Sequence, residues 1–112
     1  MGIKKWNVYL ADLSPRVGTE PGKTRPVIVV QTDLLNDYHP STVICPVTTR
    51  VQPQSNILRV HLKKGEASLT EKSDIMVDQL RAIDNRRFIR RLGMIGRVSQ
   101  KKLAENIQII LN

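Results

Sequence analysis

Residues 26–31 read Pro26-Val27-Ile28-Val29-Val30-Gln31, a nearly continuous run of β-branched side chains. Val and Ile favour extended backbone because their branched Cβ atoms pack well on a pleated surface. The run lacks the alternation of apolar and polar residues seen in half-exposed strands, so we expect a strand with both faces buried. Pro26 stands where a strand tolerates proline best, at its first residue, and disfavours helical backbone at Arg25.

Further short strands are predicted on both sides of this run. Residues 6–10 and 57–62 place an apolar side chain at every second position, which is the pattern of a strand with one buried face. Residues 42–48 and 74–83 are two more candidates. Pro46 assigns the first of these two to an edge of the sheet or to a bulge, because proline cannot donate a ladder hydrogen bond.

The C-terminal residues follow a helical period instead. Ser99 is a suitable N-cap for a helix that runs to about Leu111. Four apolar residues share one stripe of this helix: Leu103, Ile107, Ile110 and Leu111. Ile109 lies off the stripe, which indicates a second contact. Several short strands followed by one helix predict a mainly β fold, a small, strongly bent sheet or barrel that forms a single domain over residues 1–112.

The chain is strongly basic. Lys and Arg total 18 against 10 acidic residues, which gives a net charge of +8 over 112 residues. Such an excess usually indicates a polyanionic partner, either nucleic acid or a membrane surface. Eight cations but only one acidic residue, Asp84, lie between Arg81 and Lys102, although a solvated basic face is the plainer interpretation of that segment.

Location and cofactors are constrained mainly by what the sequence lacks. Cys45 is the only cysteine, so no intrachain disulfide can form, and the N-terminus has no apolar core of a signal peptide. With no stretch near the ~20 apolar residues of a membrane span, we expect a cytoplasmic protein without a membrane partner. His39, His61 and Cys45 lie in separate elements, so we expect no metal site, and no cofactor is indicated.

The remaining chemistry lies in residues 18–26, Gly-Thr-Glu-Pro-Gly-Lys-Thr-Arg-Pro, and in residues 46–49, Pro-Val-Thr-Thr. Alone, the first stretch is a glycine-containing loop that ends in an arginine, and a hairpin connection with a surface cation would explain it. Together with Trp-Asn-Val-Tyr-Leu-Ala-Asp-Leu at 6–13 and Asp-Gln-Leu-Arg-Ala-Ile-Asp at 78–84, it resembles the MazF/PemK family of toxin–antitoxin toxins. The resemblance covers nearly the whole chain.

This resemblance implies an SH3-like β-barrel, a homodimer and sequence-selective cleavage of single-stranded RNA, with mRNA as the expected target. It also implies a cognate antitoxin whose acidic, largely disordered segment blocks the RNA groove. In the family, an arginine before Pro-Val and a threonine that ends the third strand act on the scissile phosphate; here they are Arg25 and Thr48. Glu20 matches a loop carboxylate that some members use as an acid–base group, a role that varies across the family.

General chemistry agrees with these roles. RNA carries its own nucleophile, the 2′-OH beside each phosphate, so a metal-free enzyme need only align it, move a proton and stabilise phosphate charge. The Arg25 guanidinium offers a planar donor fork, the Thr48 hydroxyl adds a donor, and Glu20 can take the proton. The expected products carry a 2′,3′-cyclic phosphate and a 5′-OH.

Base selection is expected from polar loops that contact splayed bases. Residues 49–56 suit this task, and their polar composition with Pro53 indicates a mobile loop. The candidate RNA-binding residues are Arg50, Gln52, Gln54, Asn56, Gln79, Arg81, Arg86 and Arg87. Two other functions stay open: a toxin of the same fold that poisons a protein such as DNA gyrase, and a non-enzymatic RNA-binding barrel, which the scarcity of aromatic residues disfavours.

Overall fold

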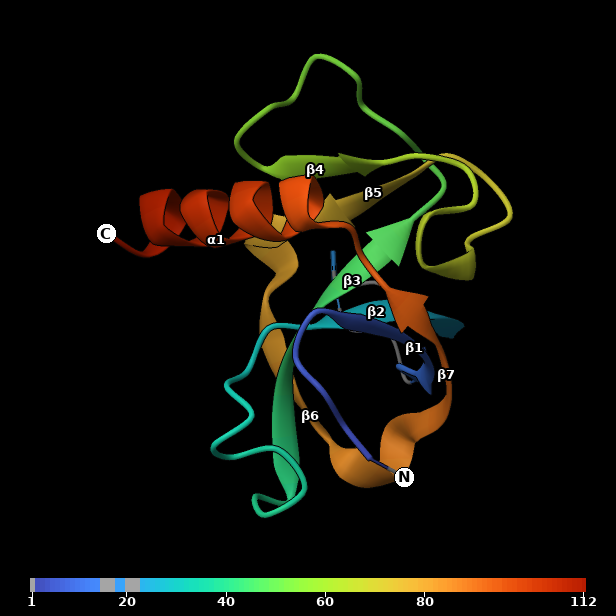
Figure 1. Cartoon of the computed structure of the whole chain (residues 1–112), viewed down its shortest axis with the longest axis vertical. Helices are drawn as coiled ribbons and strands as arrows, with labels where there is room; N and C mark the ends of the chain where they lie inside the picture. Colours follow the sequence, from blue (N-terminus) through green and yellow to red (C-terminus); the bar gives the residue numbers. More distant parts are fainter. Residues whose placement is uncertain (1, 15–17, 20–22) are drawn as a thin grey trace.

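The structure is a computed structural model that describes residues 2–14, 18–19 and 23–112. Its strands are β1 (Asn7–Asp12), β2 (Thr24–Val29), β3 (Ser41–Thr48), β4 (Arg59–Leu62), β5 (Ser73–Met76), β6 (Arg81–Asp84) and β7 (Phe88–Met94). The helical elements are α1 (Arg97–Leu111) and the single-turn 3-10 segments η1 (Glu66–Ser68), η2 (Val77–Gln79) and η3 (Asn85–Arg87). The prediction of a mainly β fold with a C-terminal helix is confirmed (Figure 1).

All strand pairs are antiparallel, in the order β4-β5-β3-β2-β1-β7, and β6 pairs with the first half of β3. On the side of β3 away from β2, residues 41–44 pair with β6, whereas Val47 and Thr48 pair with β5. The sheet therefore bends around β3, and α1 lies beside β4 (Figure 1). Among the described strands no pair joins β4 to β7, so hydrogen bonding does not close the bent sheet into a complete barrel.

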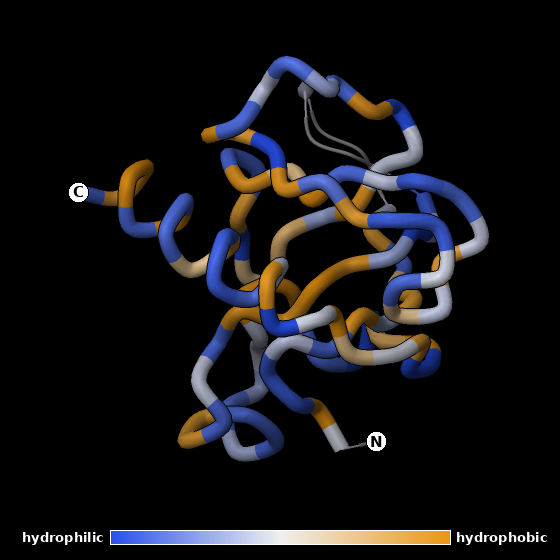
Figure 2. The backbone as a smooth tube through the Cα atoms, turned by 45° about the horizontal axis from the view of Figure 1, so that its top comes forward, coloured by the Kyte–Doolittle hydropathy of each residue, from blue (hydrophilic) through white to orange (hydrophobic). Residues whose placement is uncertain are grey.

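The apolar run at residues 26–31 forms the centre of the core, as predicted. Val27, Ile28 and Val29 are fully buried, and they belong alternately to two clusters on opposite faces of the sheet. Hydrophobic segments accordingly concentrate in the interior, with hydrophilic loops around them (Figure 2). β2 begins earlier than predicted, at Thr24, so Pro26 is its third residue and not its first.

Pro46 lies in a central strand, so the prediction of an edge strand is wrong for β3. On one side Pro46 faces Val27 of β2. On the other side, pairing with β6 ends at Ile44 and pairing with β5 begins at Val47. No strand in the described part of the chain pairs with Pro46 on that second side. A residue without an N–H is tolerated there, where one neighbouring strand replaces another.

Two strand predictions fail for local reasons. Residues 74–83 do not form one strand, because η2 separates β5 from β6 and lets the chain reach both ends of β3. β7 was not predicted at all. Its pairing with β1 has two register irregularities, which break the period of two, and its central arginines, Arg90 and Arg91, are exposed.

The C-terminal helix begins three residues before the predicted start. Gly96 is its N-cap, with the extended backbone that this position needs, so Ser99 lies inside α1 instead of capping it. Leu103 is fully buried, and Ile107 and Ile110 pack partly against the core. Ile109 is 55% exposed, which leaves its second contact unmade within one chain. No helix among the described residues is long and apolar enough to span a membrane.

Gly93 of β7 provides a test of this packing. A Cβ atom there would lie 3.0 Å from the backbone C and Cα atoms of Ala67 in η1, which cannot move aside as a flexible side chain can. Gly93→Ala is therefore expected to destabilise the protein by about 1–3 kcal/mol, the usual cost of overpacking. Thermal or urea unfolding measures the loss. Gly2→Ala is the control, since nothing lies within 4 Å of its added Cβ, and equal stability of the two variants would contradict the close contact.

Candidate active site

A pocket of about 310 Å³ lies at the end of β3. Four separate stretches of chain line it: Leu10 of β1; Thr24, Arg25 and Pro26; Val47 with Thr48, Thr49 and Arg50; and Leu69 with Thr70, Glu71 and Ser73. Arg25 and Thr48, which belong to two different sequence motifs, thus line the same pocket.

The strand register explains why Arg25 and Thr48 meet. Val27 faces Pro46 in the antiparallel β2–β3 pair, and each step back along β2 is a step forward along β3. Pairing with β3 ends at Val27, and Arg25 lies two residues before it in β2, just as Thr48 lies two residues beyond Pro46 in β3. The two side chains therefore come from neighbouring ends of adjacent strands, and both line the pocket.

Thr48 is held by a local backbone contact. Its Oγ1 accepts the N–H of Arg50 at 3.1 Å, so the chain turns out of β3 with the hydroxyl at a fixed place. A threonine hydroxyl that accepts one bond still has its own proton to donate. At the mouth of the pocket, this proton suits a phosphate oxygen.

Two carboxylates are candidates for proton transfer: Glu20, which the sequence predicted, and Glu71, which it did not. Glu20 lies outside the described residues, so its place relative to Arg25 stays a prediction. Glu71 lines the pocket from the segment before β5, and the Ser73 hydroxyl donates to its backbone carbonyl at 3.0 Å. No motif surrounds Glu71 in the sequence, and only the β3–β5 pairing brings it to Thr48.

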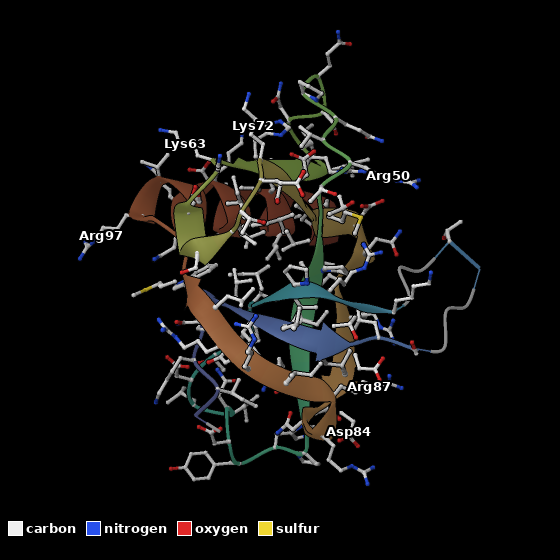
Figure 3. All side chains as sticks on the ribbon, turned by 90° about the vertical axis from the view of Figure 1, so that its right-hand side faces the viewer. Arg50, Lys63, Lys72, Asp84, Arg87 and Arg97 are labelled. Atoms are coloured by element: carbon white, nitrogen blue, oxygen red, sulfur yellow. The ribbon has the colours of Figure 1, made fainter. Side chains whose placement is uncertain are left out.

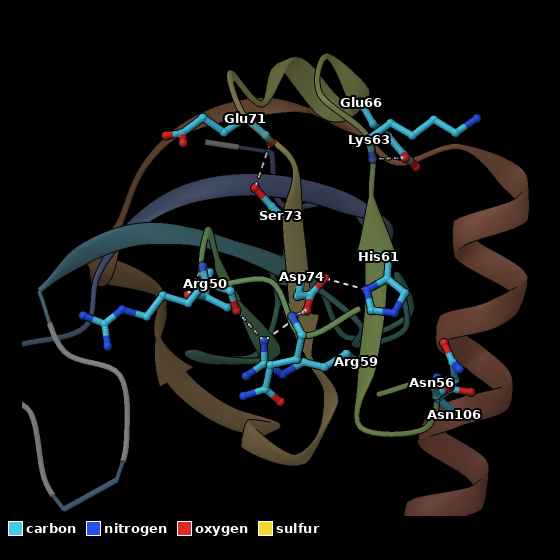
Figure 4. Close-up of polar contacts among 12 residues, drawn as sticks. Arg50, Asn56, Arg59, His61, Lys63, Glu66, Glu71, Ser73, Asp74 and Asn106 are labelled. Atoms are coloured by element: carbon cyan, nitrogen blue, oxygen red, sulfur yellow. Dashed lines mark hydrogen bonds and ion pairs between the residues drawn. The ribbon is translucent and has the colours of Figure 1, made fainter. Parts of the chain in front are cut away.

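The predicted RNA-binding loop borders the pocket through Arg50, and its side chains at Gln52, Gln54 and Asn56 are exposed. The loop is fastened at its backbone, which argues against the mobile loop that its composition suggested. The N–H of Gln52 donates to the carboxylate of Asp74, and Arg59 donates to the Arg50 carbonyl. Further along, Asn106 of α1 donates to the Asn56 carbonyl (Figure 4).

The other predicted RNA-binding residues lie elsewhere. Gln79 ends η2, and Arg81 begins β6 opposite Ile44. Arg86 and Arg87 lie in η3, directly after Asp84, the last residue of β6. Asp84 pairs with Ser41 at the start of β3, whereas the pocket lies at the end of β3. Figure 3 shows labelled cations, Arg50, Arg87 and Arg97 among them, on different sides of the molecule. The basic segment after residue 81 does not form one patch.

Both η3 arginines have partners. Arg86 makes two side-chain hydrogen bonds to Asp84, and these bonds, with one from the Arg86 N–H, lower the pKa of Asp84 to about 2. Arg87 donates to the carbonyl of Asp12 at 3.0 Å and also to that of Ser14. Arg87 thus fastens the chain where it leaves β1, a structural role that the sequence did not reveal.

The cysteine and histidine side chains complete the inventory of reactive groups. Burial raises the pKa of the Cys45 thiol to about 12, so Cys45 stays protonated in the core, as its apolar neighbours predicted. His61 has a partner in Asp74, 2.6 Å from its Nδ1. Among the described residues, no group of three His, Cys, Asp or Glu side chains is placed to hold a metal ion.

The resemblance to toxins of toxin–antitoxin systems predicts a small β fold with a C-terminal helix, which is the fold observed. The family model described as PemK-like, MazF-like toxin of type II toxin–antitoxin system matches residues 4–111. The chain belongs to this family, and that prediction is confirmed.

Similar proteins support the assignment. The chain is 32% identical over 109 residues to the Endoribonuclease MazF of Staphylococcus saprophyticus, covering 97% of this chain and 91% of the relative. The solved MazF of Deinococcus radiodurans matches with a TM-score of 0.83 at 21% identity, over 99% of this chain and 97% of that one. A mycobacterial endoribonuclease in complex with its cognate antitoxin matches with a TM-score of 0.76 at 14% identity, over 98% and 93%. The two structures establish a shared fold.

Proposed function

We propose that this toxin is an endoribonuclease that cleaves single-stranded RNA at selected sequences without a metal ion, with mRNA as its target. The class of activity follows from the family and is the activity named for the Staphylococcus relative. The observation that supports the proposed chemistry is that Arg25 of β2 and Thr48 of β3 line one pocket.

In the proposed reaction the 2′-OH attacks the adjacent phosphorus in line. A bond forms between the 2′-oxygen and phosphorus while the bond to the 5′-oxygen breaks, leaving a 2′,3′-cyclic phosphate and a 5′-OH. Arg25 neutralises charge that develops on the non-bridging oxygens, and Thr48 donates its hydroxyl proton to the same phosphate. Preorganised donors of this kind act mainly on the transition state.

Two proton transfers complete the balance: one proton leaves the 2′-OH and one reaches the 5′-oxygen. We assign the first to Glu20 on the family resemblance. Glu71 is the carboxylate that lines the described part of the pocket, and it is the second candidate for either transfer.

The RNA strand is proposed to pass from the pocket onto the loop that follows β3. Arg50 would contact the strand beside the scissile phosphate, and Gln52, Gln54 and Asn56 offer donors and acceptors to splayed bases. Gln79, Arg81, Arg86 and Arg87 remain proposed contacts to more distant parts of the RNA, of which Arg87 is already engaged with two backbone carbonyls.

A cognate antitoxin is the second proposed partner. The mycobacterial structure contains such a partner with a protein of this fold. With a net charge of +8, this chain offers an acidic antitoxin segment the same electrostatic attraction that it offers RNA. We propose that the two compete for the pocket.

The protein is also proposed to be a two-fold dimer. The buried run of β2 does not support this, because one chain covers both of its faces. The end of α1 still does: Ile109 is 55% and Leu111 69% exposed on a short helix. Sedimentation at low micromolar concentration should show twice the 12.7 kDa chain mass, and a purely monomeric species would count against the dimer.

One assay separates the proposed function from its alternatives. Purified protein is incubated with a mixed single-stranded RNA in excess EDTA, and the products are mapped by primer extension. We expect discrete cuts at recurring sequences at the same rate with and without EDTA. Binding without cuts would favour the RNA-binding barrel, and neither binding nor cuts would favour a toxin that acts on a protein.

A further inference from the structure

A row of polar residues crosses three strands beside the pocket. Thr48 of β3 faces Asp74 of β5, and Asp74 faces His61 of β4. Thr48 reaches the pocket surface, whereas the side chain of Asp74 has 0% exposure. A buried carboxylate is costly unless its oxygens are paired, so the partners of Asp74 indicate what it does.

Each oxygen of Asp74 is engaged. Oδ1 lies 2.6 Å from His61 Nδ1. Oδ2 accepts the backbone N–H of Gln52 at 2.8 Å and Nη1 of Arg59 at 3.2 Å. Two of these partners, Arg59 and His61, lie on the neighbouring strand β4 (Figure 4), but the third is the backbone of the loop that follows β3. The carboxylate therefore ties this loop to the sheet.

The same network fixes the backbone of Arg50. Arg59 Nη1, which bonds Asp74, also donates to the Arg50 carbonyl at 3.0 Å. The Arg50 N–H donates to Thr48 Oγ1 at 3.1 Å. Both backbone polar groups of Arg50 are thus held by side chains of the sheet, and its exposed side chain borders the pocket.

A second buried side chain holds the far end of the loop. Asn106 of α1 has 0% exposure, and its Nδ2 donates to the Asn56 carbonyl at 3.1 Å. Within the described structure its Oδ1 has no partner, so the bond to Asn56 is the contact that this buried amide makes there. The loop is accordingly fixed at its start by Asp74 and at its end by Asn106.

We propose that Asp74 is a positioning residue for RNA: through Gln52 and Arg59 it fixes Arg50 beside the scissile phosphate and so sets how tightly the strand is held. The inference rests on the proposed function, because it takes the loop to be an RNA contact. Asp74 itself touches no substrate. A preformed loop spares the ordering entropy that a mobile loop would lose on binding.

The test is a double-mutant cycle between Asp74→Asn and Arg50→Ala. Asp74→Asn keeps the shape of the side chain but removes the charge opposite Arg59. We expect KM for an RNA oligonucleotide to rise about tenfold with kcat changed less than about threefold, which is the signature of lost uniform binding. In the Arg50→Ala protein the same change should alter KM by less than about twofold, because coupled residues are non-additive.

The matched control is Asp33→Asn. Asp33 also accepts a backbone N–H from a distant segment, that of Lys5 at 2.9 Å, and it lies in the turn before the other end of β3. Its KM should match that of the parent. The inference would be overturned if Asp74→Asn raised KM by the same factor in the parent and in Arg50→Ala. It would also be overturned if Asp74→Asn left KM unchanged in the parent.

Two further measurements keep the outcomes distinct. Arg59→Lys preserves a positive charge near Asp74, but the lysine side chain is one bond shorter than that of arginine. This variant is used if Asp74→Asn does not fold. A tenfold rise in KM in Arg59→Lys then supports the inference, and a KM equal to that of the parent overturns it. Binding of an uncleavable 2′-deoxy oligonucleotide is measured in parallel. Parent protein that binds this oligonucleotide but does not cut the all-ribose RNA would remove the proposed chemistry alone, whereas parent protein that binds neither would remove both proposals.

Discussion

Arg25→Ala is expected to lower kcat for RNA cleavage by about 10²–10³-fold while the protein still folds. Loss of one preorganised donor to a developing oxyanion has a cost of this size. The backbone of Arg25 is paired in β2, opposite Ala11 of β1, and the buried core begins two residues later at Val27. Truncating this partly exposed side chain therefore removes the proposed phosphate contact and leaves the core side chains in place. Single-turnover cleavage and thermal unfolding measure the two quantities separately.

Arg25→Lys is the control for geometry. It keeps the positive charge but loses the planar fork that matches two phosphate oxygens, so we expect only partial recovery of the rate. Cleavage by Arg25→Ala at a rate near that of the parent would remove Arg25 from the mechanism. A large fall in melting temperature would instead assign Arg25 to the fold.

Replacing the one ribose 2′-OH on the 5′ side of the cut with hydrogen should leave the RNA bound and uncut. In the proposed reaction that hydroxyl is the nucleophile, so its removal leaves nothing to attack the phosphorus. Electrophoresis of a labelled oligonucleotide measures the cleavage, and fluorescence anisotropy measures the binding. The expected effect is complete loss of product, larger than that of any single substitution in the protein.

The matched control moves the same deoxy substitution to the ribose on the 3′ side of the cut, where cleavage should continue. Analysis of the product ends adds an independent check, because attack by the 2′-oxygen leaves a 2′,3′-cyclic phosphate. Cleavage of the first substrate at a normal rate would mean that water attacks directly. The roles proposed for Glu20, Arg25 and Thr48 would then fail together.

The sequence predicted what depends on local pattern. The run at Val27–Val29 identified the central strand because its apolar character is continuous, and the Arg25 and Thr48 motifs identified two pocket residues. What it missed depends on tertiary pairing. β7 escaped prediction because irregular pairing with β1 hides its alternation. Ser99 fits an N-cap by its side-chain oxygen, but the backbone conformation places the N-cap at Gly96.

The same limit applies to the site. Glu71 and Asp74 carry no signature in the sequence, because a carboxylate becomes informative only when its neighbours are known. Asp74 stands one residue after Ser73 in an ordinary polar segment, yet it is the most buried acid of the described chain. The polar composition of residues 49–56 suggested a mobile loop. It could not reveal that a side chain from β5 captures the backbone of Gln52.

Along β3 the neighbouring strand changes from β6 to β5, and this change affects when the pocket is completed during synthesis. A ribosome that has released the chain only as far as Thr48 has delivered both Arg25 and Thr48, but not Ser73–Met76, which pair with the end of β3. Pairings this far apart in the chain form late, because their loop-closure entropy is lost before any contact compensates for it. The nascent polypeptide therefore lacks one wall of its pocket until the ribosome has passed β5.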